Sequence, residues 1–204
     1  TTVDLTVPQG VHLVGIGGAG MSAIAHVLWC MGHTVTGSDL KRSAPVDRLT
    51  AVSIPIAIGH AAANVGDADL VARSSAVPDH NPEIREARAR GIPVLRRADV
   101  LAAIASVKPT IAVGGTHGKT TTSSMVALCL LASDQNPSFV IGGDLNEVGS
   151  GAAWTDGPWF VVEADESDGT FTELARTIAV VTNVEPDHLD HFGSVDAMEA
   201  AFDR

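Results

Sequence analysis

The sequence predicts an α/β protein built from two successive parallel-sheet units, a Rossmann-like unit followed by a P-loop-type nucleotide-binding unit that is cut short. Short β-rich runs alternate with helical patterns, which is typical of a parallel sheet covered by helices. Two glycine turns, at residues 15–20 and 114–118, each follow an apolar run and lead into a helical pattern. The order of strand, glycine turn and helix is typical of sites where backbone N–H groups surround phosphates.

The first unit begins with a predicted strand at residues 12–16 and a helix at 20–31. Asn81 is predicted to cap a helix at 82–90, because Asn suits the N-cap and the following Pro82 suits the first helical position. The other elements predicted here are strands at 35–37, 54–58, 70–72 and 92–95, and helices at 45–51 and 97–106.

The run Ser106-Val107-Lys108-Pro109 interrupts this pattern, so we place the domain boundary between residues 106 and 107. The units are therefore 1–106 and 107–204. The second unit is predicted to continue with strands at 160–162 and 178–182. Its last helix starts at Val195 and is still running where the sequence stops, so we expect the chain to be a fragment.

The composition excludes several classes of protein. With 45% hydrophobic and 18% charged residues, the 204-residue chain is typical of a globular protein. A formal charge of −11 argues against a nucleic-acid partner. No apolar run approaches the roughly 20 residues that a membrane span needs, and no signal peptide is visible. Cys30 and Cys129 lie in apolar helical patterns, so we expect buried, reduced thiols in a cytoplasmic protein.

Residues 114–121 read Gly-Gly-Thr-His-Gly-Lys-Thr-Thr and predict an ATP site. Lys119 is expected along the β- and γ-phosphates, with the Thr120 hydroxyl as a ligand of Mg²⁺. The usual pattern has four residues between its first glycine and the Gly-Lys pair, whereas Gly114 leaves three and Gly115 leaves two. The alternative is a glycine-rich turn that binds nothing.

The first glycine loop, Gly-Ile-Gly-Gly-Ala-Gly at residues 15–20, is followed about twenty residues later by Asp39 at the end of the second predicted strand. This arrangement matches the dinucleotide fingerprint. It does not identify the ligand, because both NAD and a UDP-sugar carry a pyrophosphate. Close packing of helix on sheet, with no ligand, is the other interpretation.

Two further segments carry groups that bind metals. The strand ending at Glu163 runs into carboxylates, and alternation along a strand places Glu163 and Asp165 on one face, where they are suited to Mg²⁺. Glu163 is the better-placed ligand. In the loop after the strand at 178–182, Asp187, His188 and Asp190 are candidates for a metal ligand or a base, although a lone His in a loop is as often structural.

Together these motifs resemble the Mur ligases, the ATP-dependent amide-forming enzymes of peptidoglycan precursor synthesis. The resemblance covers nearly the whole chain and rests on residues 15–22, 37–39, 59–60, 74–76, 81–83, 115–121, 163–168 and 183–190. The string Ile-Gly-Gly-Ala-Gly-Met at 16–21 favours the member that adds L-alanine to UDP-N-acetylmuramate over the member that recycles a murein tripeptide.

The resemblance implies a three-domain enzyme, of which this chain holds the UDP-N-acetylmuramate-binding domain and about half of the central ATPase domain, but not the C-terminal amino-acid-binding domain. It implies that ATP phosphorylates the lactyl carboxylate and that the amine of L-alanine then attacks the acyl phosphate, releasing ADP and phosphate. We expect the fragment alone to be inactive. The resemblance leaves a monomer or a weak homodimer as the expected oligomeric state.

The resemblance also implies roles for individual residues. Lys119 stabilises the transferring phosphoryl group, Thr120 and Glu163 hold one Mg²⁺, and His188 helps to hold a second. His117 stands where other Mur ligases often carry Asn. The residues expected at the nucleotide are Gly115, Thr116, His117, Gly118, Lys119, Thr120 and Thr121. Those expected at the substrate are Gly15, Gly17, Gly18, Ala19, Gly20, Asp39, Ser74, Ser75 and, with less support, Asn183.

Two alternatives stay open. One is an NAD(P)-binding oxidoreductase domain fused to an unrelated P-loop module, although Mg²⁺-type carboxylates have no role in hydride transfer. The other is a catalytically silent fragment that only binds nucleotide, because a parallel sheet cut midway exposes apolar edges.

Overall fold

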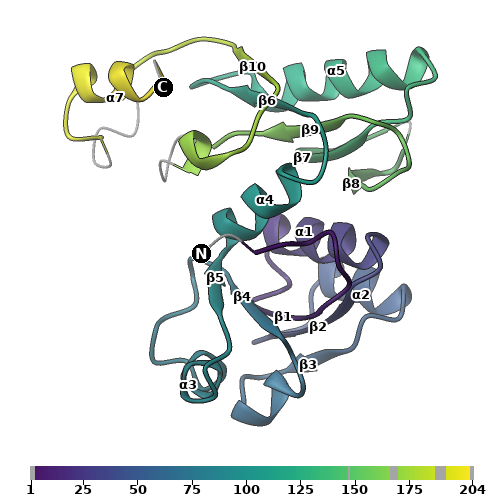
Figure 1. Ribbon diagram of the computed structural model, residues 1–204, viewed down its shortest axis with the longest axis vertical. Helices are drawn as coiled ribbons and strands as arrows, with labels where there is room; N and C mark the ends of the chain where they lie inside the picture. Colours follow the sequence, from purple (N-terminus) through teal and green to yellow (C-terminus); the bar gives the residue numbers. More distant parts are fainter. Residues whose placement is uncertain (1–2, 147, 166–169, 187–191, 203–204) are drawn as a thin grey trace. The chain divides into compact units, whose positions relative to one another are not determined.

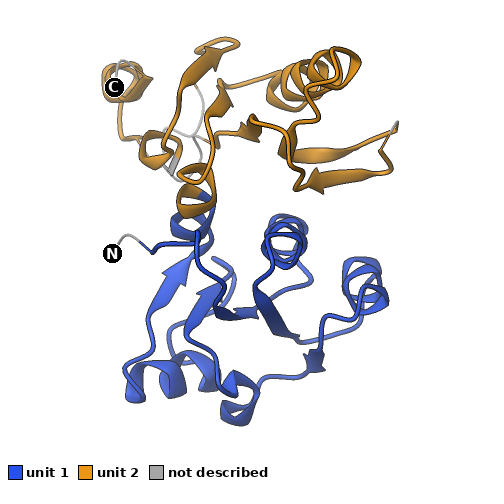
Figure 2. Cartoon of the chain, turned by 45° about the vertical axis from the view of Figure 1, so that its right-hand side comes forward, with its two compact units in different colours: residues 1–101 blue, residues 102–204 orange. Residues whose placement is uncertain are grey.

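The computed structural model describes residues 3–146, 148–165, 170–186 and 192–202. The chain divides into two compact units, Thr1–Leu101 and Ala102–Arg204 (Figure 2). The division falls inside helix α4 (Arg97–Ala105), and the domain boundary at 106/107, just after this helix, stays a prediction.

The first unit is a five-stranded, all-parallel sheet with the strand order β3-β2-β1-β4-β5 (Figure 1). Its strands are β1 (Gly10–Val14), β2 (Thr34–Asp39), β3 (Ile56–Ile58), β4 (Leu70–Arg73) and β5 (Val94–Arg96). Its helices are α1 (Ala19–Cys30), α2 (Ala44–Ala51), the 3-10 helix η1 (Ala62–Val65), α3 (Pro82–Ala89) and the start of α4. This strand order confirms the predicted Rossmann-like fold, and the loops after β1 and β4 diverge at the carboxyl edge of the sheet.

The core of this unit forms because apolar residues face both sides of the sheet. Leu13 and Val14 of β1 are fully buried, and helix α1 covers one side through Ile24 and Leu28. The predicted cap is also confirmed, since the Asn81 side chain accepts a hydrogen bond from the backbone N–H of Glu83 over 2.8 Å.

The second unit contains a sheet with the order β10-β6-β9-β7-β8. Its elements are β6 (Thr110–Gly114), α5 (Lys119–Ala132), β7 (Ser138–Leu145), β8 (Ser150–Ala153), β9 (Phe160–Glu163), the 3-10 helix η2 (Thr170–Glu173), β10 (Ile178–Val181) and α7 (Val195–Phe202). Strands β10, β6, β9 and β7 are parallel, whereas β8 pairs antiparallel with β7. The core side of β7 packs through Phe139 and Ile141 against Ala127 of α5 and Val161 of β9.

Strands β7 and β8 are absent from the elements that the sequence predicts. β7 begins with the strand-type run Phe-Val-Ile, but Gly142 and Gly143 interrupt its pattern, and β8 reads Ser-Gly-Ala-Ala, which has none of the β-branched or aromatic residues that indicate a strand. At the other side of the sheet, Ile178 and Val181 of β10 are 44% and 50% exposed. An exposed apolar edge of this kind is what the sequence led us to expect.

The expectation that both cysteines are buried is wrong. Cys30 and Cys129 are exposed free thiols on α1 and α5. Both helices are rich in apolar residues on more than one face, so composition alone does not show which residues turn towards the sheet. No helix among the described residues is long and apolar enough to cross a lipid bilayer.

Candidate functional site

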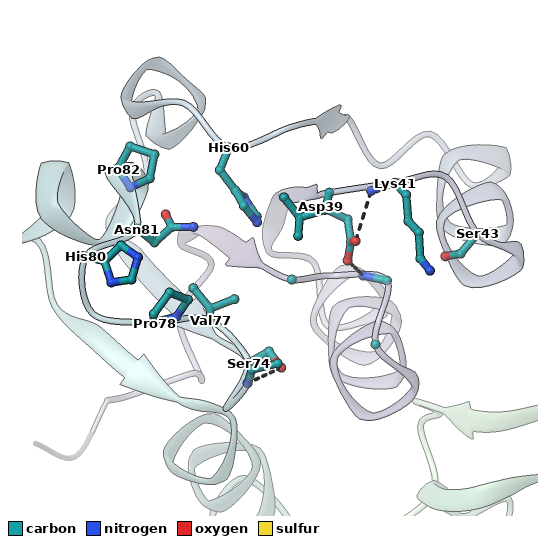
Figure 3. A pocket seen from close by; sticks show the side chains of 15 residues that line it. Asp39, Lys41, Ser43, His60, Ser74, Val77, Pro78, His80, Asn81 and Pro82 are labelled. Atoms are coloured by element: carbon teal, nitrogen blue, oxygen red, sulfur yellow. Dashed lines mark hydrogen bonds between the residues drawn. The ribbon is translucent and has the colours of Figure 1, made fainter.

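A cavity of about 540 Å³ opens at the carboxyl ends of β1, β2 and β4 in the first unit (Figure 3). It lies where the strand order reverses, which is the usual ligand position in an open α/β sheet. The cavity is lined by Gly15, Gly17, Gly18, Asp39, Leu40, Lys41, Ser43, His60, Ser74, Ala76, Val77, Pro78, His80, Asn81 and Pro82.

The glycine loop is held in place by Asp39 at the end of β2. The backbone N–H of Gly17 donates to Asp39 Oδ2 over 2.8 Å. A Cβ at Gly17 would lie 2.9 Å from that oxygen and 2.9 Å from Val46 Cγ2, so only glycine fits here. Asp39 Oδ2 is therefore engaged with the glycine loop, whereas among the described residues Oδ1 has only a 3.4 Å contact with the Lys41 N–H.

Five of the residues predicted at the substrate line this cavity, namely Gly15, Gly17, Gly18, Asp39 and Ser74. Three others are not among its lining residues. Ala19 and Gly20 form the first turn of α1, and Ser75 is an exposed neighbour of Ser74. A Cβ at Gly20 would lie 3.0 Å from Arg97 Nη1, so this glycine permits close packing inside the unit. The contacts of these residues with substrate stay predictions.

Beneath the cavity lies a buried carboxylate that the sequence analysis did not single out. Glu83 at the start of α3 is fully buried. Its Oε2 accepts from the Ser38 hydroxyl over 2.6 Å, and its Oε1 accepts from Asn64 Nδ2 over 2.6 Å and from the backbone N–H of Ala61 over 3.2 Å. Two histidines flank Oε2, with His12 Nε2 at 3.5 Å and His60 Nδ1 at 3.4 Å.

The environment of Glu83 keeps its side chain ionised. Burial acts to raise the pKa of this carboxyl, but the contacts with His12, Ser38, Asn64 and the Ala61 N–H act in the opposite direction and lower it to about 2. The Glu83 carboxylate is thus a buried negative charge that is stabilised by three hydrogen-bond donors and two imidazoles. Of these groups only His60 also lines the cavity.

In the second unit the predicted phosphate loop lies between β6 and α5. Gly115 and Gly118 have φ values of +124° and +81°, which only glycine adopts readily. Gly118 is the N-cap of α5, and no side chain caps the helix start. The first N–H groups of α5 and the positive end of its dipole are therefore open to an anion.

Lys119 and the two threonines after it are positioned at this helix start. Lys119 Nζ lies back over the loop and donates to the Gly115 carbonyl over 2.8 Å. Thr120 and Thr121 are exposed in the first turn of α5. A phosphate bound in the loop would be a stronger acceptor for Lys119 than this neutral carbonyl.

Glu163 at the end of β9 faces the same helix start. Its Oε1 accepts from the Ser123 hydroxyl over 3.1 Å and from the backbone N–H of Gly142 over 2.9 Å. A Cβ at Gly142 would lie 2.9 Å from Glu163 Oε2 and 3.4 Å from Thr120 Oγ1, so the carboxylate and the hydroxyl both lie next to Gly142. Carboxylate and hydroxyl oxygens are the ligands that Mg²⁺ prefers. Within the described residues, no group of three or more His, Cys, Asp and Glu side chains is arranged to hold a metal ion.

The segment after β10 holds the phosphate loop from the other side. Asn183 Oδ1 accepts from the His117 N–H over 2.9 Å, and Thr182 Oγ1 donates to the His117 carbonyl over 2.6 Å. Thr116 is buried and its hydroxyl accepts from the Glu185 N–H over 3.0 Å. Asn183 thus supports the loop, and its predicted contact with substrate stays a prediction.

His188, the third predicted metal ligand, lies outside the described residues together with Asp187 and Asp190.

Comparison with known families gives two matches that together span most of the chain. The profile described as "Mur ligase family, catalytic domain" matches residues 10–109, and the profile "Mur ligase middle domain" matches residues 113–204.

Among individual proteins, the chain is 53% identical over 192 residues to a UDP-N-acetylmuramate–L-alanine ligase of Acidiphilium cryptum and 56% identical over 191 residues to that of Rhodospirillum rubrum. Each alignment covers 94% of this chain but 40% of the relative, so the chain spans about two fifths of the length of these relatives.

Solved structures show the same likeness. The UDP-N-acetylmuramate-alanine ligase of Thermotoga maritima aligns with a TM-score of 0.88 and 36% identity, over 96% of this chain and 46% of that one. A UDP-N-acetylmuramate:L-alanyl-gamma-D-glutamyl-meso-diaminopimelate ligase of Neisseria meningitides aligns with a TM-score of 0.86 and 29% identity, over 96% of this chain and 67% of that one.

Proposed function

The chain belongs to the Mur ligase family, and on that premise we propose that it carries the UDP-sugar-binding and phosphate-binding parts of a ligase that joins L-alanine to UDP-N-acetylmuramate. The observation that carries this proposal is that the Thr120 hydroxyl and the Glu163 carboxylate both lie beside Gly142 at the start of α5, where they would serve as oxygen ligands of Mg²⁺. The sequence identities of 53% and 56% to L-alanine ligases support alanine as the amino acid, as does the structural alignment, in which the chain is 36% identical to an alanine ligase and 29% identical to the tripeptide-type ligase.

The proposed reaction transfers the γ-phosphoryl group of ATP to the lactyl carboxylate of UDP-N-acetylmuramate, which gives an acyl phosphate and ADP. The amine of L-alanine then attacks the acyl carbon, loses a proton, and displaces inorganic phosphate as the amide bond forms. Both steps bring anions together, so they need cations and aligned N–H donors more than a covalent nucleophile.

In this proposal the second unit holds ATP. The N–H groups at the start of α5 surround the phosphates, and Lys119 moves from the Gly115 carbonyl to the β- and γ-phosphates. Thr120 and Glu163 would hold Mg²⁺, which neutralises charge on the phosphates when it is bound. His188 is proposed for a second Mg²⁺ from sequence alone.

The first unit would hold the UDP moiety. Its glycine loop lies at the start of α1, where backbone N–H groups and the helix dipole favour a diphosphate. The family of the chain favours a UDP-sugar over NAD. A cytoplasmic location fits a consumer of ATP and UDP-N-acetylmuramate, and a monomer or weak homodimer stays our expectation.

Calorimetric titration of the chain with UDP-N-acetylmuramate, with NADH and with MgATP tests this proposal. We expect binding of the UDP-sugar and MgATP but not of NADH. Gly17→Val should abolish UDP-sugar binding and leave MgATP binding intact, and Lys119→Ala should do the reverse. Circular dichroism of each variant separates lost binding from unfolding, because a Cβ at Gly17 also crowds Asp39 and Val46. Binding of NADH without the UDP-sugar would overturn the ligase proposal and support the oxidoreductase alternative.

A further inference from the structure

His60 is a cavity-lining residue to which the proposed function gives no role. It follows β3, and its side chain is 13% exposed. Figure 3 shows the His60 ring between the Asn81 and Asp39 side chains, within the set of residues around the cavity. The ring is held from beneath, because Nδ1 lies 3.0 Å from Ser38 Oγ and 3.4 Å from Glu83 Oε2.

The hydrogen bonds of Ser38 and Glu83 determine which nitrogen of His60 carries hydrogen. Ser38 has one hydroxyl hydrogen, and its 2.6 Å contact with the ionised Glu83 carboxylate uses it. Both oxygens that face Nδ1 therefore act as acceptors there, so Nδ1 carries the hydrogen. In a neutral imidazole the other nitrogen, Nε2, is then an acceptor.

The position of His60 indicates which part of a ligand it meets. β3 is two strands away from β1, and adjacent strands are about 4.8 Å apart, so His60 lies about 10 Å along the sheet edge from the glycine loop. A nucleoside attached to a diphosphate in the glycine loop spans a distance of this order. Leu40, which is 74% exposed and also lines the cavity, offers an apolar surface for a planar base.

We propose that His60 contacts the nucleoside of the bound uridine diphosphate ligand and that its Nε2 accepts a hydrogen bond from a ring N–H or a ribose hydroxyl. Ser38 and Glu83 are positioning residues that hold the ring in this tautomer. The inference rests on the proposed function of the first unit, and it adds a specificity contact that the glycine loop does not provide.

The chain contains a matched control for this proposal. His12 flanks the same Glu83 oxygen at 3.5 Å, and its Nδ1 also meets a hydroxyl, that of Thr36 at 2.9 Å. Unlike His60, His12 is 1% exposed and is not among the residues that line the cavity. A loss of binding that arises only from disturbance of the Glu83 cluster should appear in variants of both histidines.

The test is calorimetric titration of the chain with UDP at pH 8. His60→Asn keeps an N–H donor near the Nδ1 position and removes the acceptor at Nε2, so we expect about tenfold weaker binding. His60→Gln places an amide oxygen near the Nε2 position and should stay within about threefold of the parent chain. His12→Asn should bind UDP as the parent does, once circular dichroism has shown that each variant is folded.

Two ligand analogues identify the donor and do not depend on any variant. If the ring N–H is the donor, N3-methyl-UDP should bind the parent chain about tenfold more weakly than UDP, and if a ribose hydroxyl is the donor, 2′-deoxy-UDP or 3′-deoxy-UDP should do so. Equal binding of all analogues, unchanged binding by His60→Asn, or equal losses in His60→Asn and His12→Asn would overturn the inference alone. Failure of the parent chain to bind either UDP or UDP-N-acetylmuramate would overturn the proposed function as well.

Discussion

The Ser123 hydroxyl donates to Glu163 Oε1 over 3.1 Å, so helix α5 and strand β9 are joined at the carboxylate proposed to hold Mg²⁺. Ser123 is fully buried one turn into the helix that begins at Lys119. The Gly142 N–H donates to the same oxygen, and Oε2 of Glu163 lies beside Gly142, as does Thr120 Oγ1. The carboxylate is therefore oriented before any ligand binds.

Ser123→Ala should weaken the Mg²⁺-dependent part of ATP binding several-fold. The variant removes one of two donors to Glu163 Oε1. Because the one Ser123 hydroxyl hydrogen is shared with the Lys119 carbonyl at 2.8 Å, we expect a loss at or below the lower end of the about 1.5–3 kcal/mol that a hydrogen bond to a charged group is worth. The measurement is ATP affinity with Mg²⁺ and with EDTA. Ser124→Ala is the control, since its side chain is not among the described contacts of Glu163. An equal loss with and without Mg²⁺ would point to a structural role for Ser123 instead.

Gly17→Ala should destabilise the first unit, whereas Gly18→Ala should not. A Cβ at Gly17 meets Asp39 Oδ2 and Val46 Cγ2 at 2.9 Å, but at Gly18 the nearest atom is the Gly15 carbonyl oxygen at 3.6 Å, and Gly18 has φ −66°. Overpacking of this kind costs about 1–3 kcal/mol. Urea unfolding measures the difference in stability between the two variants. Equal stabilities would show that Asp39 and helix α2 move aside at little cost in free energy.

Many features of the cavity in the first unit and of the phosphate loop in the second unit depend on residues that are close in sequence, so they could be predicted. The two glycine loops, the Asn81 cap and the carboxylate at the end of β9 each depend on a few neighbouring residues whose backbone requirements are visible in the sequence. The parallel, Rossmann-like sheet of the first unit could be predicted from the alternation of strands and helices, because parallel strands need helical crossovers between them.

The Glu83 cluster could not be predicted, because its members meet only in three dimensions. Glu83 is 45 residues from Ser38, and in sequence it stands only in the family string 81–83, as an acidic residue in the first turn of a helix. His60 was visible only as part of a short string shared with the family. Strand β7 was missed for a different reason, since its glycines make room for Glu163 and Thr120 at the expense of strand propensity.

The 204-residue chain alone should not form the amide bond. It spans about two fifths of the length of its relatives, and no residue that would bind L-alanine is apparent among the described ones. We expect UDP-N-acetylmuramate and MgATP to bind without alanine-dependent release of ADP. A coupled assay for ADP, with and without alanine, makes the measurement, and alanine-dependent turnover would show that the chain holds a complete active site.

Lys108→Met should destabilise the second unit by about 2–3 kcal/mol. Nζ of Lys108 donates to the carbonyls of Thr155 and Gly157 over 2.5 and 2.9 Å and to Ser138 Oγ over 3.1 Å, and it lies 4.2 Å from the centre of the Trp154 ring. Methionine keeps the apolar stem but leaves these acceptors without their donor.

The measurement for Lys108 is urea unfolding, and the control is Lys41→Met, which removes an exposed lysine. Burial lowers the pKa of Lys108, and Asp156 acts in the opposite direction. Burial of the ammonium charge therefore costs free energy, which the three hydrogen bonds offset. Equal free energies of unfolding for the two variants would mean that the hydrogen bonds of Lys108 only compensate for the burial of its charge and add no net stability.

The stability of the first unit should fall in acid because of Glu83. Its folded pKa of about 2 lies below the ordinary value of 4.5, so the folded state binds fewer protons than the unfolded state between these values. The stabilising contribution is complete above about pH 5 and is lost as the pH falls through 4.5 towards 2, a total of about 3 kcal/mol.

Glu83→Gln has no carboxyl to titrate, so its stability should depend less on pH in this window. The comparison of urea unfolding between pH 6 and pH 3 isolates Glu83 from the exposed carboxylates, which both proteins share. Parallel pH profiles for the two proteins would show that the Glu83 pKa is not lowered by folding.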